Sequence, residues 1–312
     1  SNGDQDVTLQ TGNSTTGSIT ITDGANGNIA ITPNGSGAIQ LDGLSWPTVD
    51  GSTDQVLKTD GSGTLSWSSA ATSINGLSDA LVEDNSTYLG NDPSSTTDDA
   101  LRNVAVGLIA LDAITTGDNN VAVGYNALTA NTTGSHNIGI GYNALKDNVG
   151  GTSNAAIGYG SLASNTSGQF NTGVGSSSLN ANINGQRNVG IGNSSLRDNS
   201  SGNYNTAVGK SSGQSITTGD DNVTIGHQAG ILLTTGNYNT ILGSDSDPSA
   251  EDAINQTMIG YNVTGQADNS VTLGNADVTD IYMAQDKGAT VHAAGADLSG
   301  STGIILENDE TI

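Results

Sequence analysis

An aliphatic residue and a glycine recur together at a fixed interval through the middle of the chain. The glycines run from Gly107 to Gly260 and follow one another every seventeen residues. The residue before each glycine is always Val, Ile or Leu, and an asparagine stands four residues before it in every repeat but the last, where Gln256 replaces it. A second glycine column follows ten residues later, from Gly117 to Gly236. Columns that keep this phase indicate a solenoid with one coil per repeat.

Each repeat contains a short alternating stretch, such as Val121-Ala122-Val123 before Gly124. On a β-strand the two valines point to one side and the alanine to the other. Seventeen residues suffice for two short strands and two turns, with Gly124 and Gly134 turning at positive φ. Ten coils at the strand spacing of ~4.8 Å predict a parallel β-solenoid roughly 45–50 Å long. We expect the aliphatic side to face its interior, through Val121, Val123, Ile140, Ile157, Val174, Ile191, Val208 and Ile225.

Two further columns predict how the coils are held together. Asparagines in one column can hydrogen-bond from coil to coil and so satisfy buried polar groups. This predicts a structural ladder of Asn120, Asn137, Asn154, Asn171, Asn188 and Asn205. A leucine stands four residues after each of the first six coil glycines, from Leu111 to Leu196, before Gly213 and Gly230 take its place. We expect this leucine stack to fill the roll and the packing to change near Ser211.

The strand position between the two aliphatic residues is Ala or Gly in the first seven coils. A solvated strand has little reason to exclude larger residues, whereas a position pressed against another backbone does. We therefore predict a parallel homotrimer whose copies meet at Ala122, Gly139, Ala156, Gly173 and Gly190. Descent of all the repeats from one Ala/Gly-rich ancestor is the alternative explanation.

The repeat resembles the head repeat of trimeric autotransporter adhesins. The motif appears as Asn188-Val189-Gly190-Ile191-Gly192 and most fully as Asn-Ser-Val-Thr-Leu-Gly at residues 269–274. The resemblance covers about half of the chain and implies a left-handed parallel β-roll in which three chains lie side by side. The coil of this chain is longer than is usual in that family.

The segments on either side of the roll have other patterns. Residues 1–44 contain alternating apolar and polar strands that recur every ten residues, and they predict a β shaft that one chain cannot cover alone. Residues 45–100 form a connector with a hairpin at 56–59 and 64–67, one helical turn at 78–84 and a polar loop at 91–99. Residues 101–265 form the roll, and residues 266–312 a neck or shaft segment.

Two flanking stretches resemble phage tail fibre proteins. Residues 46–51 and 55–67 share a phrase common in such fibres, and residues 271–282 resemble the segment that often precedes an endosialidase-type intramolecular chaperone. The resemblance implies a structural tail fibre of a virion, attached to other virion proteins through a terminus. The head of a bacterial surface adhesin, with an extracellular location, is the alternative.

Composition and charge limit the kinds of fold and of binding partner that the chain can have. Glycine accounts for 44 of the 312 residues and aromatic residues for only 4%, which suits a stack of thin coils better than an ordinary globular core. There is no cysteine for a disulfide, and the net charge of −24 argues against nucleic acid as a partner. No apolar run is long enough for membrane insertion.

The sequence contains no recognisable catalytic constellation. His136, His227 and His292 lie far apart, so we expect no metal site. The serines have no base beside them, and the glycine-rich phrases lack the strand–helix context and lysine of a phosphate-binding loop. We therefore expect neither a cofactor nor an enzyme, and a polysaccharide depolymerase is the least favoured function.

Large and planar side chains recur in the column just before the asparagines. Aromatic and arginine side chains on a surface suit stacking on sugar rings or anchoring a protein. These residues predict contact with a host surface glycan or protein: His136, Phe170, Arg187, Tyr204 and Tyr238. The alternative is that they cover the corner of the coil or wedge against a neighbouring chain. Tyr125, Tyr142 and Tyr159 predict a second, structural stack.

Overall fold

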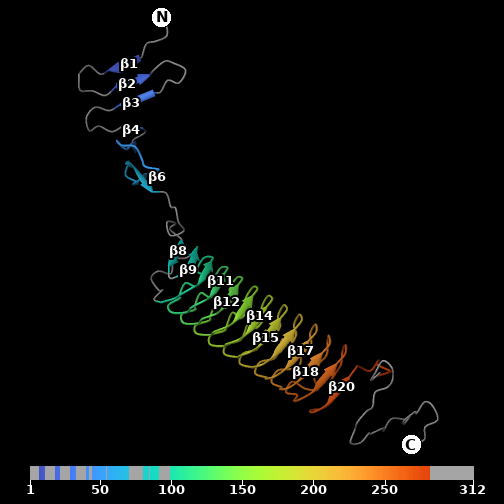
Figure 1. Ribbon diagram of the computed structural model, residues 1–312. Coiled ribbons are helices and arrows are strands. Elements are labelled where there is room, and N and C mark those ends of the chain that lie inside the picture. The colour runs from blue at the N-terminus through green and yellow to red at the C-terminus, as the bar shows by residue number, and fades with distance from the viewer. Residues whose placement is uncertain are drawn as a thin grey trace, which may run out of the picture.

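A computed structural model of the chain describes residues 7–10, 18–21, 29–32, 40–41, 44–53, 55–69, 80–83, 85–90 and 99–281 (Figure 1). These residues are all-β and contain no helix. The strands before the roll are β1 (Val7–Gln10), β2 (Ser18–Ile21), β3 (Ile29–Thr32), β4 (Gln40–Leu41), β5 (Leu44–Ser45), β6 (Gln55–Thr59) and β7 (Leu65–Ser69). Those of the roll are β8 (Ala80–Glu83), β9 (Ser86–Leu89), β10 (Val104–Val106), β11 (Val121–Val123), β12 (Ile138–Ile140), β13 (Ala155–Ile157), β14 (Thr172–Val174), β15 (Val189–Ile191), β16 (Thr206–Val208), β17 (Val223–Ile225), β18 (Thr240–Leu242), β19 (Thr257–Ile259) and β20 (Val271–Leu273).

The predicted parallel β-solenoid is confirmed. Strands β8 to β20 form one sheet in sequence order, and every pair from β9 to β20 is parallel. Each residue of the strands β9 to β18 pairs with the residue seventeen positions further on, as in Ala122 opposite Gly139. The step from β19 to β20 shortens to fourteen, with Met258 opposite Thr272. Figure 1 shows the strands in one row along the stack of coils.

Each coil contains one three-residue strand, not the two that we expected. Three positions outside the strand take left-handed backbone angles, as in Asn126 (φ 61°), Leu128 (φ 53°) and His136 (φ 61°), and they interrupt any longer extended segment. The turns still bond from coil to coil, since the Leu128 N–H donates to the Ala144 carbonyl at 3.0 Å. The whole circumference is thereby hydrogen-bonded.

Glycine is required in the two glycine columns for different reasons. Gly124 has φ 130°, and a side chain there would place Cβ 2.7 Å from the Gly141 carbonyl oxygen, so this column needs glycine for both angle and space. Gly134 does not have a positive φ, contrary to our expectation. Its Cβ would lie 2.8 Å from the Asn148 amide nitrogen, so the second column is glycine because the next coil lies against it.

The predicted alternation along the strands is confirmed, but the face that was predicted to point inward points outward. The small residue between the aliphatic pair is buried, and the eight aliphatic side chains expected inside lie on the outer face of the sheet. The interior is filled instead by the leucine stack, which is fully buried from Leu111 to Leu196. A Cβ on Gly139 would lie 3.2 Å from Leu128 Cγ, so little volume remains for a strand side chain.

This packing also corrects the predicted trimer contacts. Ala122, Gly139, Ala156, Gly173 and Gly190 are buried inside a single chain and cannot meet a second copy. Their small size is explained within the same chain: Leu128 lies against Gly139, and the hydroxyls of Ser161 and Ser178 lie closest to Gly173 and Gly190. The expected change of packing near Ser211 is confirmed, because Thr224, Ile241 and Met258 occupy the inner strand position once the leucines end.

The sheet begins earlier than the seventeen-residue pattern indicated. The helical turn expected at 78–84 is wrong for the described part, where β8 pairs antiparallel with β9. Strand β9 pairs parallel with β10 and is followed by Gly90, which stands seventeen residues before Gly107. Ser86 takes the place of the column asparagine, and its Oγ accepts from the Asn103 N–H at 2.9 Å. The serine hid this coil from the sequence pattern.

The segments before the roll form small antiparallel sheets. Strands β1, β2 and β3 pair in order, and the predicted hairpin is present as β6 and β7. Asp60 closes the hairpin turn, since its Oδ1 accepts from the N–H groups of Ser62 at 2.8 Å and Thr64 at 3.0 Å. Most of the polar loop expected at 91–99, and the neck beyond residue 281, lie outside the described residues.

Candidate functional site: the outer sheet face and its two edges

The outer face of the sheet is a stripe of exposed aliphatic side chains. It consists of the third residue of β10 to β20, which is Val, Ile or Leu in every strand, and of the first residue, which is Val, Ile or Ala in seven strands and threonine in the other four (Thr172, Thr206, Thr240 and Thr257). Ile140 is 37% exposed, Ile191 41% and Leu242 45%, although these are among the most apolar residues of the chain. Isolated surface aliphatics need no explanation, but a continuous stripe marks an interaction surface.

The predicted asparagine ladder supports one margin of this face. Asn120 is fully buried, and its Nδ2 donates to Asn103 Oδ1 at 3.1 Å and to the Gly134 carbonyl at 2.9 Å. The Asn120 N–H also donates to Asn103 Oδ1, at 2.9 Å. The other members, Asn137, Asn154, Asn171, Asn188 and Asn205, are joined in the same column. The ladder therefore fixes the corner at which each strand begins.

A second asparagine ladder was missed by the sequence analysis. It lies seven residues after the coil glycines, where Asn148 Nδ2 donates to Asn131 Oδ1 at 2.7 Å and to the Gly151 carbonyl at 3.0 Å. Asn165, Asn182 and Asn199 continue it. The signal was available as a fifth column in phase, but Ile114, Ile216 and Leu233 replace asparagine at its ends.

The proposed receptor-binding residues lie in one exposed column, which we call the leading edge because it immediately precedes the ladder asparagine and the strand. This edge contains His136, Phe170, Arg187, Tyr204 and Tyr238, all exposed. Three of them form a stack: the Arg187 guanidinium lies 5.3 Å from the Phe170 ring centre and 5.4 Å from the Tyr204 ring centre, and Arg187 Nη1 donates to Tyr204 Oη at 3.0 Å. Such cation–π contacts hold the three side chains as one wall.

A second exposed column borders the other margin of the sheet, directly after the coil glycine, and we call it the trailing edge. Tyr125, Tyr142 and Tyr159 stack here as predicted, with ring centres 5.4 Å and 5.2 Å apart. Further along this column come Lys210 and His227. The aliphatic stripe thus lies between two polar and aromatic edges.

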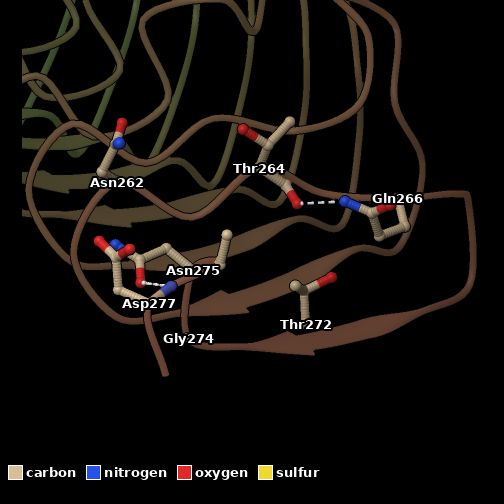
Figure 2. Close-up of a pocket in the computed structure, with 8 residues that line it drawn as sticks. Asn262, Thr264, Gln266, Thr272, Gly274, Asn275 and Asp277 are labelled. Atoms are coloured by element: carbon tan, nitrogen blue, oxygen red, sulfur yellow. Dashed lines mark hydrogen bonds between the residues drawn. The ribbon is translucent and has the colours of Figure 1, made fainter. Parts of the chain in front are cut away.

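A cavity lies at the C-terminal end of the roll, beside β20 (Figure 2). It has a volume of about 430 Å³ and is lined by Asn262, Thr264, Gln266, Thr272, Gly274, Asn275, Ala276 and Asp277. Gln266 Nε2 donates to the Thr264 carbonyl at 2.9 Å, and the Asp277 N–H donates to Asn275 Oδ1 at 3.0 Å. Asp277 is the one titratable residue among the eight, so this cavity brings no acid–base pair together.

Titratable side chains do not converge elsewhere in the part of the chain described. His136 lies 3.5 Å from the Asn119 amide, and His227 Nδ1 lies 3.4 Å from Asp245 Oδ1, on a different coil. No group of three His, Asp or Glu side chains within the described ranges is placed to hold a metal ion. Nor does this part of the chain include a helix that could cross a membrane.

Comparison with known proteins does not assign the chain to a family. No protein-family description matches the sequence, and no curated protein matches it either. The function must therefore be argued from the outer face of the sheet and its edges.

Proposed function

We propose that the chain is a structural fibre protein of a phage virion, a tail fibre that assembles as a parallel homotrimer and contacts the host surface. One observation carries the proposal: within the part of the chain that the structure describes, no segment covers the aliphatic stripe on the outer face of the sheet. A monomer rarely exposes a continuous apolar patch of more than a few hundred Å². A second and third copy of the same stripe provide a complementary cover.

The size of the stripe suits such an assembly. Eleven strands, β10 to β20, at ~4.8 Å give a face roughly 50 Å long. Three-residue strands give a width of roughly 10 Å, so each chain offers roughly 500 Å² before its edges are counted. Stable interfaces bury about 800 Å² on each partner, which the stripe and its two edges together can provide.

The rest of the chain favours a fibre. A solenoid grows in one dimension, and its ladders and glycine columns stiffen it along that axis. The antiparallel strands β1 to β3 alternate apolar and polar residues and precede the roll on the chain. The resemblance of residues 46–51, 55–67 and 271–282 to phage tail fibres supports a virion location over a bacterial surface.

The assembly is tested with two isoleucines of similar exposure. Ile191 lies on the stripe and is 41% exposed, whereas Ile183 lies in a turn away from the sheet and is 49% exposed. We expect Ile191→Asp to convert the trimer to a folded monomer, because a carboxylate cannot be buried unpaired between copies. Ile183→Asp is the control and should stay trimeric. Sedimentation equilibrium gives the mass, and circular dichroism shows that the fold is retained.

Ionic strength is a second variable of the same experiment. Three copies would carry three times −24, a net charge of −72, so salt should strengthen the assembly by screening this repulsion. A chain that is monomeric at every salt concentration, or an Ile191→Asp variant that stays trimeric, would contradict the proposal.

The location is tested separately with an antibody against residues 99–281. Gold-labelled antibody should bind the tail of purified phage particles in electron micrographs. Labelling of bacterial cells that carry no phage would favour the adhesin head, to which the coil motif also has a resemblance.

A further inference from the structure

Side-chain size alternates between the two edges of the sheet. At the coils of Gly124, Gly141 and Gly158 the trailing edge carries Tyr125, Tyr142 and Tyr159, while the leading edge carries Asn119, His136 and Ser153. At the next three coils the leading edge carries Phe170, Arg187 and Tyr204, while the trailing edge carries Ser176, Asn193 and Lys210. Phe, Tyr and Trp never occupy both edges of one coil between residues 119 and 261.

The last three coils continue the pattern. Tyr238 on the leading edge has Ser244 on the trailing edge, and Tyr261 on the trailing edge has Asn255 on the leading edge. The remaining coil has no Phe, Tyr or Trp on its edges and carries an acid, Asp221, on the leading edge, with His227 on the trailing edge. Every coil from Gly124 onwards therefore combines a large side chain with a smaller one, or an acid with an imidazole.

Contacts within one chain do not explain this alternation. The two edge residues of a coil are six positions apart and enclose the strand, so they are separated by roughly 20 Å if the segment is extended. The contacts observed along each edge join neighbouring coils instead, as in the tyrosine stack and the Phe170–Arg187–Tyr204 wall. Two such walls occupy opposite edges and follow one another along the roll.

We infer that the leading edge of one copy packs against the trailing edge of the next with the coils level, so that Phe170, Arg187 and Tyr204 lie against the partner's Ser176, Asn193 and Lys210. This inference rests on the proposed homotrimer. When copies pack by the same sheet face around a parallel axis, the leading edge of each meets the trailing edge of its neighbour.

The level arrangement is the one in which the walls fit. Copies that slipped by three coils at each contact would set Tyr125, Tyr142 and Tyr159 of one copy against Phe170, Arg187 and Tyr204 of the next, wall against wall, and would build an open helical array in place of a closed trimer. In the level arrangement each wall faces side chains that are smaller than the rings of that wall or flexible, with His136 the largest opposite the tyrosines, and Asp221 faces the partner's His227. Side-chain size on the edges therefore favours the closed, level trimer over slipped, open arrays, which the aliphatic stripe alone does not distinguish.

Cysteine pairs test the register, because the chain has no cysteine of its own. Asp221→Cys with His227→Cys places one thiol on each edge of one coil, too far apart to bond within a chain. We expect mild oxidation to link this variant into covalent trimers on a denaturing gel. The control variant, Asp221→Cys with Ser244→Cys, moves the second thiol one coil further on and should remain unlinked.

A bulky residue introduced on the edge that carries the smaller side chain of a coil gives a second test of the register. Ser176→Trp faces Phe170 of the next copy in the level arrangement, so we expect trimer dissociation to become at least ten-fold more favourable. Ser167→Trp is the control, because Ser167 is exposed on a turn outside both edges and should leave the trimer unchanged.

The outcomes separate the inference from the proposed function. A wild-type chain that sediments as a monomer overturns the assembly and the inference together. A trimer that links only through the shifted cysteine pair, or through neither pair, overturns the register alone. A trimer unaffected by Ser176→Trp likewise overturns it and leaves the leading edge free for a host glycan.

Discussion

The early and late coils of the roll fill the same interior in two different ways. In the early coils a leucine from the turn, such as Leu128, packs on a small strand residue, Gly139, of the next coil. In the late coils glycine occupies the turn position and the strand supplies the bulk, as in Gly230 with Ile241. Because a Cβ on Gly230 would lie 2.9 Å from Ile241 Cδ1, each arrangement excludes a large side chain at both positions.

The two arrangements differ in backbone strain. Leu128 has φ 53° and Leu196 φ 48°, in the left-handed region that costs a non-glycine residue on the order of 1 kcal/mol. Gly213 and Gly230 have φ 55° and 68° in the same column without that cost. Burial of a leucine contributes about 1.5–3 kcal/mol, so the early coils remain favourable despite the strain. The interior of each coil is therefore filled to a similar extent, by a turn leucine in the early coils and by the strand residue in the late coils.

The largest effect is expected from emptying the early position. Leu128→Gly relieves the backbone but leaves a cavity beside Gly139, and we expect a loss of about 3–5 kcal/mol in unfolding free energy. Thermal unfolding at a fixed chain concentration, followed by circular dichroism, measures it. Ile183→Gly is the control, because Ile183 is 49% exposed in a turn outside both edges and its loss opens no cavity. Equal losses in the two variants would contradict the packing described.

Overfilling the same coil should be slightly less damaging. Gly139→Ile introduces the strand residue of the late coils while Leu128 remains, so the two side chains clash. We expect a loss of about 2–3 kcal/mol, the range typical of overpacked cores. The same unfolding experiment applies, and a stability equal to wild type would show that the interior has unfilled space near Leu128.

The second asparagine ladder distinguishes the middle coils from both ends, where the same buried column holds Ile114, Ile216 and Leu233. Asn165→Leu interrupts the ladder in its middle and leaves Asn148 Oδ1 without its donor, while the Gly168 carbonyl keeps the donor Asn154 Nδ2. We expect a loss of about 2 kcal/mol, as for buried polar groups left unpaired.

The end of that ladder provides the control. Among the described residues, Asn199 Oδ1 is buried and has no hydrogen-bond partner, because Ile216 follows it in the column. Asn199→Leu should therefore cost less than Asn165→Leu, since it breaks one link to the ladder instead of two. Equal losses would show that the ladder does not act as a connected unit.

Much of the fold was readable from the sequence, because a period kept over nine intervals leaves one architecture. The ladder asparagines, the leucine stack and the coil glycines follow from their columns alone. Which face of the strand points inward did not follow, since a Val-Ala-Val strand alternates equally well with either face inside. The leucine column contained the missing information: Leu128 already fills the interior, so Ala122 or Gly139 must face it. The predicted trimer contact was misplaced for the same reason, because the interaction face was assigned to the small residues that point inward.

Combining the two changes tests whether the arrangements are interchangeable. Leu128→Gly with Gly139→Ile copies the late arrangement into an early coil, and Ala127 already matches Ala229 beside it. We expect the double variant to lie within about 1 kcal/mol of wild type, with a coupling energy of about 4 kcal/mol or more, above the usual 0.5–3 kcal/mol. Losses that simply add would show that the early coils cannot accept bulk from the strand.

The smallest effect concerns Asp247, which occupies the leucine position of the coil after Gly230. Burial raises the pKa of this carboxyl above its usual range, although its Oδ1 accepts from the Leu232 N–H at 2.8 Å. A raised pKa means that the fold favours the protonated acid, so the cost of the charge is absent below the unfolded pKa of 3.8 and fully present above the folded pKa.

Asp247→Asn keeps an acceptor for Leu232 and removes the charge. We expect it to stabilise the roll at neutral pH by no more than about 1 kcal/mol, because solvent screens a half-buried carboxylate. The advantage should vanish as the pH falls to 3.8, and a difference in melting temperature that stays constant with pH would show that Asp247 is not held in a buried environment.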